Sequence, residues 1–321
     1  MACPAQQKNK VAGMIRLSPF KSLARSLYYS SYRAYATAIN LIYPPVVVLA
    51  YHRVAQLEDD ALQLAVTPQH FVEQLEVITA IFDDVWRFDT AWACPAQPVV
   101  CLTFDDGYAD NYITALPILE RFQIPATFFI STGHVENNWP YWWDVLNACG
   151  CLEEHGRILA MRPAEQQKAI AVLLESHNFP SKALANHRPL TIGELQDISY
   201  HPLTCIGAHT HTHPRLSNLS AEHQYQEIKT SLDKLEAWTR QRPTVAAYPF
   251  GARSPLGRFC DYNSDSRQAC RKLGLSRVAA NFPGQFRPWT DPYAIPRHLV
   301  RDWDGPTFKA NLLSFLTRGY F

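Results

Sequence analysis

Short apolar runs alternate with longer segments of helical periodicity along most of the chain. The expected strands cover residues 46–51, 99–104, 126–131, 204–208, 245–248, 277–280 and 295–300. The expected helices cover residues 68–82, 111–122, 163–175, 192–199, 221–239 and 266–273. This alternation is typical of an α/β protein with a parallel sheet, and seven strand-like segments favour a small, distorted (β/α) barrel over an open sheet.

The first 44 residues follow a different pattern. Before Pro44 and Pro45, apolar residues recur at helical spacing among basic ones, and residues 1–57 contain no Asp or Glu. We therefore expect a basic amphipathic segment at 1–44 and a catalytic domain at 45–321. The amphipathic helix either docks on the domain or associates peripherally with an anionic membrane surface through residues 11–43. No cleavable signal peptide is expected, because Arg and Lys interrupt the apolar residues.

Composition narrows the class of protein only slightly. Thirty Lys and Arg against 29 Asp and Glu give a net charge of +1, which gives no reason to expect a nucleic-acid partner. The eight Cys are irregularly spaced and are expected to be free, mostly buried thiols. Free thiols favour a reducing compartment, so the expected location is cytoplasmic, with the inner face of the membrane as the alternative place if the N-terminal helix binds lipid.

Two adjacent carboxylates follow the apolar run 99–104. Asp105 and Asp106 precede Gly107 in the segment TFDDG. A turn here would direct the two side chains differently, so that one can bind a metal while the other transfers protons. Asp-Asp-Gly is also an ordinary turn sequence, so this segment alone leaves both interpretations open.

Three histidines follow the apolar run 204–208. His209, His211 and His213 stand in the segment HTHTHP. Imidazole is a common ligand for zinc and similar ions, and two histidines four residues apart can reach one ion. One carboxylate with two histidines leaves coordination positions open for water and substrate, as a hydrolytic metal site requires.

In this order, the motifs resemble those of the polysaccharide deacetylase, or NodB-homology, family of metal-dependent carbohydrate esterases. TFDDG at 103–107 resembles the first family motif, HTHTH at 209–213 fits the second, and YPFG at 248–251 resembles the third. The similarity covers roughly residues 46–300. The resemblance implies a distorted (β/α)7 TIM-like barrel.

The resemblance also implies roles for individual residues. Asp105 would be the catalytic base, and the backbone N–H of Phe250 would stabilise the oxyanion. His211 falls on a variable position, where hydrogen bonding within the loop explains it at least as well as ligation. The residues that would hold a divalent metal, usually zinc in this family, are Asp106, His209 and His213.

One departure from the family pattern concerns the residue that orients the base. The third motif usually carries an Arg two residues before its Pro, but residue 247 is Ala. Arg297, in the last expected strand, is our candidate replacement because it can reach the same mouth of the barrel. A plain surface salt bridge is the alternative role for this arginine.

A second departure concerns the general acid. The last family motif ends a strand with Leu-x-His, but near the C-terminus His298 follows Pro296, which is unfavourable in a central strand. His52 instead ends the apolar run VVVLAY near the front of the chain. Because some branches of the family are circularly permuted, and the chain resembles that arrangement, we assign the acid to His52 and keep His298 as the alternative. A structural hydrogen-bonding role is the third option.

The resemblance implies a hydrolase that removes N-acetyl groups from amino sugars of a polysaccharide or glycolipid. An amino-sugar N-deformylase, another linear-amide hydrolase or a non-catalytic carbohydrate-binding protein are the alternatives. Aromatic side chains after the run 126–131 are expected either to stack on sugar rings or to pack in the core. They are Trp139, Trp142 and Trp143. The insertion 144–188 is expected to shape the substrate cleft.

Overall fold

The apolar runs that predicted strands form one parallel sheet. The computed structural model describes residues 38–90, 92, 94–176, 185–254 and 260–317. In chain order the strands of the sheet are β1 (Val46–Tyr51), β4 (Val99–Phe104), β5 (Ala126–Ile130), β6 (Thr204–Ala208), β7 (Val245–Ala247), β8 (Arg277–Ala279) and β9 (His298–Leu299). Their order in space is β8-β7-β6-β5-β4-β1-β9. A two-stranded ribbon, β2 (Arg53–Val54) with β3 (Ala65–Val66), follows β1.

The segment 295–300 brings the two edges of the sheet together. Ile295 pairs with Ala279 of β8, whereas β9, which begins three residues later, pairs with β1. The sheet is therefore curled, and the predicted distorted seven-stranded barrel is confirmed. The last strand is shorter than predicted because Pro296 has no N–H to donate to a neighbouring strand.

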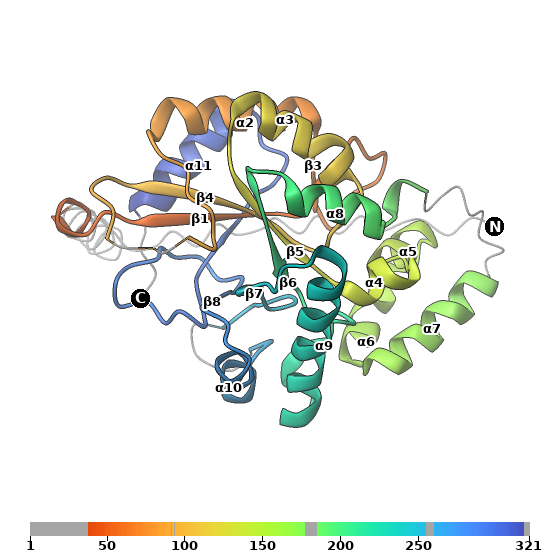
Figure 1. Cartoon of the computed structure of the whole chain (residues 1–321). Coiled ribbons are helices and arrows are strands. Elements are labelled where there is room, and N and C mark those ends of the chain that lie inside the picture. Colours follow the sequence, from red (N-terminus) through yellow and green to blue (C-terminus); the bar gives the residue numbers. More distant parts are fainter. Residues whose placement is uncertain (1–37, 91, 93, 177–184, 255–259, 318–321) are drawn as a thin grey trace, which may run out of the picture.

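Amphipathic helices cover the outer face of the sheet (Figure 1). They are α2 (Pro68–Ile81), α3 (Leu116–Phe122), α8 (Ile192–Tyr200), α9 (Ala221–Thr239), α10 (Ser264–Lys272) and α11 (Gly305–Thr317). Side-chain caps fix several of their starts: the hydroxyls of Thr67, Thr191 and Ser220 each accept a hydrogen bond from a backbone N–H in the first turn. The predicted helix 111–122 begins instead as a π-helical turn, Asn111–Ala115, ahead of α3.

Four helices lie between β5 and α8, where the sequence pattern predicted only the helix 163–175. They are α4 (Thr132–Asn137), α5 (Trp142–Ala148), α6 (His155–Ala160) and α7 (Pro163–Ser176). They gather on one side of the barrel (Figure 1), and α5, α6 and α7 share an aromatic core of their own. The three short ones were missed because helices of six or seven residues show too few turns for a clear periodic pattern.

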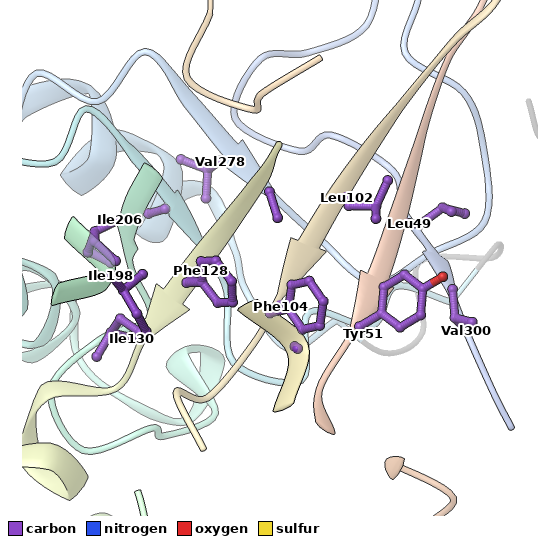
Figure 2. Packing of buried hydrophobic residues seen from close by; sticks show 14 of the residues in the cluster. Leu49, Tyr51, Leu102, Phe104, Phe128, Ile130, Ile198, Ile206, Val278 and Val300 are labelled. Atoms are coloured by element: carbon purple, nitrogen blue, oxygen red, sulfur yellow. The ribbon is translucent and has the colours of Figure 1, made fainter. Parts of the chain in front are cut away.

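A row of stacked aromatic rings runs across three neighbouring strands, on the face of the sheet that the helices cover (Figure 2). Tyr51 stacks on Phe104 at 5.3 Å between ring centroids, and Phe104 stacks on Phe128 at 5.0 Å. The three rings stand at matching positions of β1, β4 and β5, because Tyr51 pairs with Phe104 and Phe104 with Phe128. Alternate residues such as Val48 point to the barrel interior, so the strands are buried on both faces.

Most of the predicted N-terminal segment, residues 1–37, lies outside the described residues. Residues 38–42 are helical, and Asn40 donates to the carbonyl of Leu316 at the end of α11 (2.8 Å). Leu41 and Ile42 are 81% and 66% exposed. Within the described ranges, no helix has the length and apolar character needed to cross a bilayer. Membrane-surface association of residues 11–43 and the domain boundary at residue 44 stay predictions.

Candidate active site

Loops at the carboxyl ends of the strands bring the predicted site residues, apart from Arg297, to one cavity of about 210 Å³. Asp105 and Asp106 follow β4, His209 follows β6 and His52 follows β1. Because parallel strands end at the same edge of a sheet, residues about 150 positions apart in sequence meet at this edge.

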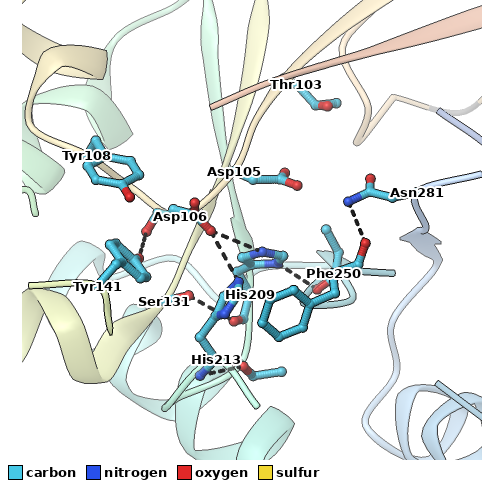
Figure 3. Close-up of polar contacts among 12 residues, drawn as sticks. Thr103, Asp105, Asp106, Tyr108, Ser131, Tyr141, His209, His213, Phe250 and Asn281 are labelled. Atoms are coloured by element: carbon cyan, nitrogen blue, oxygen red, sulfur yellow. Dashed lines mark hydrogen bonds and ion pairs between the residues drawn. The ribbon is translucent and has the colours of Figure 1, made fainter. Parts of the chain in front are cut away.

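Asp106, His209 and His213 form a buried cluster that fits a metal ion. The Nε2 atoms of His209 and His213 lie 3.5 and 3.2 Å from Oδ1 of Asp106 (Figure 3). Ligand atoms that share one zinc ion at about 2.0–2.2 Å in a tetrahedral arrangement are about 3.4 Å apart. The three side chains therefore already have the spacing of metal ligands, and they leave further coordination positions open.

Hydrogen bonding prepares His209 for ligation. Its Nδ1 lies 2.9 Å from the carbonyl oxygen of Ala247, which can only accept, so Nδ1 carries the proton and Nε2 presents its lone pair to the cluster. Ala247, which stands where the family usually has Arg, thus contributes its backbone to the site. Burial tends to raise the pKa of Asp106, but when the histidines are protonated, their hydrogen bonds and the charges of His213 and His52 hold that pKa well below its usual range.

The backbone at the cluster adopts conformations that side chains other than glycine rarely take. Asp106, Thr210, His213 and Phe250 have φ values of +75°, +64°, +56° and +60°. Such residues cost on the order of 1 kcal/mol each and persist only where surrounding contacts fix them. One such contact is the hydroxyl of Tyr141, which donates to the backbone carbonyl of Asp106 at 2.7 Å.

Asp105 points away from Asp106 and pairs with Arg297. The two Nη atoms of Arg297 donate to Oδ1 and Oδ2 of Asp105 at 2.7 and 2.6 Å. The side chains are 0% and 1% exposed, so the alternative role of a surface salt bridge for Arg297 is wrong. Burial tends to raise the pKa of Asp105, but the charges of Arg297 and His209 and the Arg297 hydrogen bonds outweigh burial and lower it.

Asn281 links this ion pair to the third motif. Its Oδ1 accepts from Nη2 of Arg297 (2.7 Å), and its Nδ2 donates to the carbonyl of Phe250 (2.8 Å). Gly251 allows this close approach, because a Cβ at this position would lie 2.8 Å from the backbone nitrogen of Asn281. Asn281 was not among the predicted site residues, although a polar residue directly after the strand-like run 277–280 was a usable signal.

The two candidate acids lie in different surroundings. His52 lines the cavity, and its pKa is lowered mainly by burial, against the charges of Asp106 and Asp105. His298 stacks on Phe315 of α11 at 3.9 Å and does not line the cavity. The geometry therefore favours His52.

His211 does not join the metal cluster. Its Nδ1 lies 3.0 Å from the hydroxyl of Thr132. The adjoining backbone is held by Glu227, whose carboxylate accepts from the N–H groups of His211 and Thr212.

The insertion and the loop after β2 complete the cavity wall. Trp143, 4% exposed, contacts the ring of His213 at 5.1 Å and faces the cavity, together with His155 of α6 and with Leu62 and Leu64. Trp142 is also buried, whereas Trp139 is 37% exposed. Tyr141 and His155 were missed because no chemical motif surrounds them in the sequence.

A family model of known proteins matches more than half of this chain. A family model described as polysaccharide deacetylase matches residues 93–278. The chain belongs to the polysaccharide deacetylase family. The resemblance read from the three motifs is thereby confirmed, and the metal dependence of the family agrees with the Asp106–His209–His213 cluster. Circular permutation of the barrel stays a prediction.

Individual members of the family that resemble the chain are distant. The YxkH protein of Bacillus subtilis (strain 168) is 23% identical over 207 residues, 64% of this chain and 52% of that protein. The poly-beta-1,6-N-acetyl-D-glucosamine N-deacetylase of Staphylococcus aureus (strain MSSA476) is 26% identical over 226 residues, 64% of this chain and 59% of that protein. The chain thus matches little more than half the length of these curated relatives.

Among solved structures, the Streptococcus pyogenes deacetylase PplD in complex with acetate superposes with a TM-score of 0.60. The match covers 85% of this chain and 99% of that chain at 20% identity. IcaB from Ammonifex degensii gives a TM-score of 0.58 at 18% identity, over 85% and 97% of the two chains. At such identities the likeness establishes the fold.

Replacing a ligand of the cluster should remove the metal. Mutation of residues that only hydrogen-bond to metal ligands weakens metal binding roughly 10–100-fold. We expect His213→Ala, which removes a ligand, to weaken the binding of added zinc by more than this. His211→Ala, in the same loop, is the matched control and should keep the metal because its side chain bonds to Thr132. Equilibrium dialysis followed by metal analysis measures both, and equal losses would contradict the assigned ligand set.

Breaking the buried ion pair should destabilise the fold strongly. Arg297→Leu leaves Asp105 charged and unpaired in the interior, which typically costs about 3–5 kcal/mol of unfolding free energy. Arg242→Leu is the control: Arg242 pairs with Asp233 and Glu236 near the surface, where a pair is worth up to about 1 kcal/mol. Equilibrium unfolding in denaturant measures the free energy of unfolding of both variants. Similar decreases would mean that the buried pair of Arg297 contributes no more to stability than a surface pair.

Proposed function

We propose that the chain is a metal-dependent hydrolase that removes the acetyl group from the nitrogen of amino sugars in a glycan. The observation that carries this proposal is the placement of the Asp106–His209–His213 cluster and the Asp105–Arg297 pair at one cavity. Amide hydrolysis by water requires a metal site beside a carboxylate that is fixed in position to accept a proton. The name of the Staphylococcus aureus relative, an N-deacetylase of a polymeric amino sugar, supports the substrate class.

Zinc is the metal that we propose, because one carboxylate and two imidazoles are typical of its catalytic sites. When bound, it would polarise the amide carbonyl and lower the pKa of water in the site. Asp106, His209 and His213 would hold it.

Asp105 acts as the general base in this proposal. The lowered pKa keeps its carboxylate ionised, so it can take a proton from the attacking water. Arg297 fixes the plane of the carboxylate through two hydrogen bonds and so sets the direction in which the remaining lone pairs point.

Phe250 and His52 act on the other two atoms of the amide. The backbone N–H of Phe250 would donate to the oxyanion, and the loop is held in place by the bond from Asn281 to the Phe250 carbonyl. His52, on the cavity wall, would protonate the departing amine. The reaction then consumes one water and yields acetate and a free amino sugar.

An N-deformylase or another linear-amide hydrolase would use the same groups, and only the acyl pocket and the acceptor would differ. A non-catalytic carbohydrate-binding protein is the alternative of a different class. The complete ligand set and the paired base argue against it, because neither is needed to bind sugar.

Acetate release from an oligomer of N-acetylglucosamine tests the activity and the base together. We expect turnover by the zinc-loaded protein, loss with a chelator and recovery when zinc is restored. Asp105→Asn should lower kcat by about 10²–10⁴-fold while keeping the metal. Asp302→Asn, at an exposed carboxylate that pairs with His70 and does not line the cavity, is the control and should retain activity. Near-normal turnover of the Asp105 variant would show that the base is misassigned, and absence of turnover by the wild type would favour the binding protein.

The general acid can be identified through the leaving group. A departing amine needs a proton, whereas p-nitrophenolate does not, so His52→Ala should lower amide turnover by about 10²–10⁴-fold but largely spare hydrolysis of p-nitrophenyl acetate. His298→Ala is the matched control, because its ring packs under α11. A selective loss of amide turnover in the His298 variant would reverse the assignment.

A further inference from the structure

A second cavity, of about 300 Å³, lies within the insertion between β5 and β6. One wall is a face of α7, and the other is the turn that connects α4 to α5. Figure 1 shows α7 running beside α5 and α6 on this side of the barrel. The volume is at the lower end of the range of small-molecule sites, about 300–1,000 Å³.

The α7 wall is a continuous stripe along the helix. Its lining residues follow the spacing i, i+3, i+4, i+7, i+8 and i+11, which places them on one face. They are Pro163, Gln166, Gln167, Ile170, Ala171 and Leu174. Opposite them stand Trp139, Pro140 and Trp142, so most of the lining is hydrocarbon or aromatic.

The polar groups at this cavity are largely occupied by the protein itself. Thr212 uses its N–H and its hydroxyl to bond Glu227. Nδ1 of His134 lies 3.1 Å from the carbonyl of Trp139, and Nε2 of Gln166 donates to the carbonyl of Ile158. Apart from Nε1 of Trp142, which is buried without a hydrogen-bond partner among the described residues, these groups offer a sugar ring few new bonds. The hydroxyl groups of a sugar would therefore lose water at a cost that a hydrocarbon group does not incur.

Only one layer of aromatic side chains separates this cavity from the candidate active site. Trp142 lines the second cavity and contacts Trp143 at 5.2 Å and His155 at 4.9 Å. Trp143 and His155 line the active-site cavity. The two cavities therefore share a wall, and a group attached to a ligand in the first cavity has only this layer to cross to reach the second.

We propose that the second cavity binds the hydrocarbon part of an amphiphilic substrate, an amino sugar that carries an alkyl or aryl group. This inference rests on the proposed function for the identity of the head group. The apolar lining and the occupied polar groups select hydrocarbon over a further sugar unit. The shared wall sets the reach from the reacting amide to the apolar group.

The test compares the methyl and octyl glycosides of N-acetylglucosamine, below the concentration at which the octyl compound forms micelles. Calorimetry on the Asp105→Asn variant of the 321-residue chain measures Kd without hydrolysis. Burial of only two methylene groups corresponds to about tenfold in affinity, so we expect the octyl glycoside to bind at least tenfold more tightly. Its binding should also show the more negative heat-capacity change of apolar burial.

Filling the cavity should remove this preference. Ala171→Phe, added to the Asp105→Asn protein, places a ring in the cavity from an exposed position of α7, so the fold should be kept. Val172→Phe is the matched control, because Val172 is on the same helix, is 63% exposed and does not line the cavity. We expect the octyl-to-methyl ratio to fall to near one in the first variant only.

Equal affinities for the two glycosides, or equal effects of the two substitutions, would overturn the proposal. A third contrary outcome concerns a tetramer of N-acetylglucosamine: the Ala171 variant would lose affinity for the tetramer as much as for the octyl glycoside. The last would identify the cavity as a sugar subsite. Failure of the proposed function has a different signature, since the wild type would then hydrolyse neither glycoside while the octyl preference persisted.

Discussion

The buried pair between Arg297 and Asp105 is the interaction on which both the barrel and the site depend. All five N–H groups of Arg297 donate, to Asp105, Thr103, Asn281 and the carbonyl of Ala280. These partners belong to β4 and the residue directly after it and to the segment after β8, whereas Arg297 itself lies in the segment that closes the sheet. One side chain thus joins the closing segment to both sides of the barrel and orients the carboxylate at its mouth. Such a pair is costly to bury, so its value lies in holding this one arrangement.

The metal cluster depends on strained backbone that other parts of the chain hold in place. Asp106 and His213 both have positive φ, and neither is glycine. Tyr141, from the insertion, bonds the carbonyl of Asp106, and the Thr210 hydroxyl accepts from the N–H of His213. The His and Asp side chains are therefore set before any ion binds, which reduces the entropy that binding must overcome. The insertion contributes to the chemistry by fixing the backbone of a ligand, without supplying a ligand itself.

The sequence predicted those features of the fold and site that have a local signature. Apolar β-branched runs located the strands, and the motifs at their ends located Asp105, Asp106, His209 and His213. Arg297 was predictable because the usual Arg is missing at residue 247, and a buried carboxylate without a partner demands a cation nearby. Tyr141 and His155 were beyond reach, since their roles arise from the packing of short helices whose positions no periodic pattern reveals.

The barrel supplies the metal ligands and the base, and the insertion supplies much of the walls of the two cavities. Residues at the strand ends, such as Asp105 and His209, can only be moved by deforming a sheet that is buried on both faces, so the chemistry of the barrel is fixed. The insertion is attached through loops, packs on its own aromatic core and supplies Trp143 and His155 to one cavity and Trp142 to the other. Changes in α6 and α7 can therefore alter the walls of the two cavities, whereas Tyr141 and Trp143, at the start of α5, contact the metal ligands Asp106 and His213. Selectivity for the acceptor should accordingly reside in the insertion, and the acyl-transfer chemistry in the barrel.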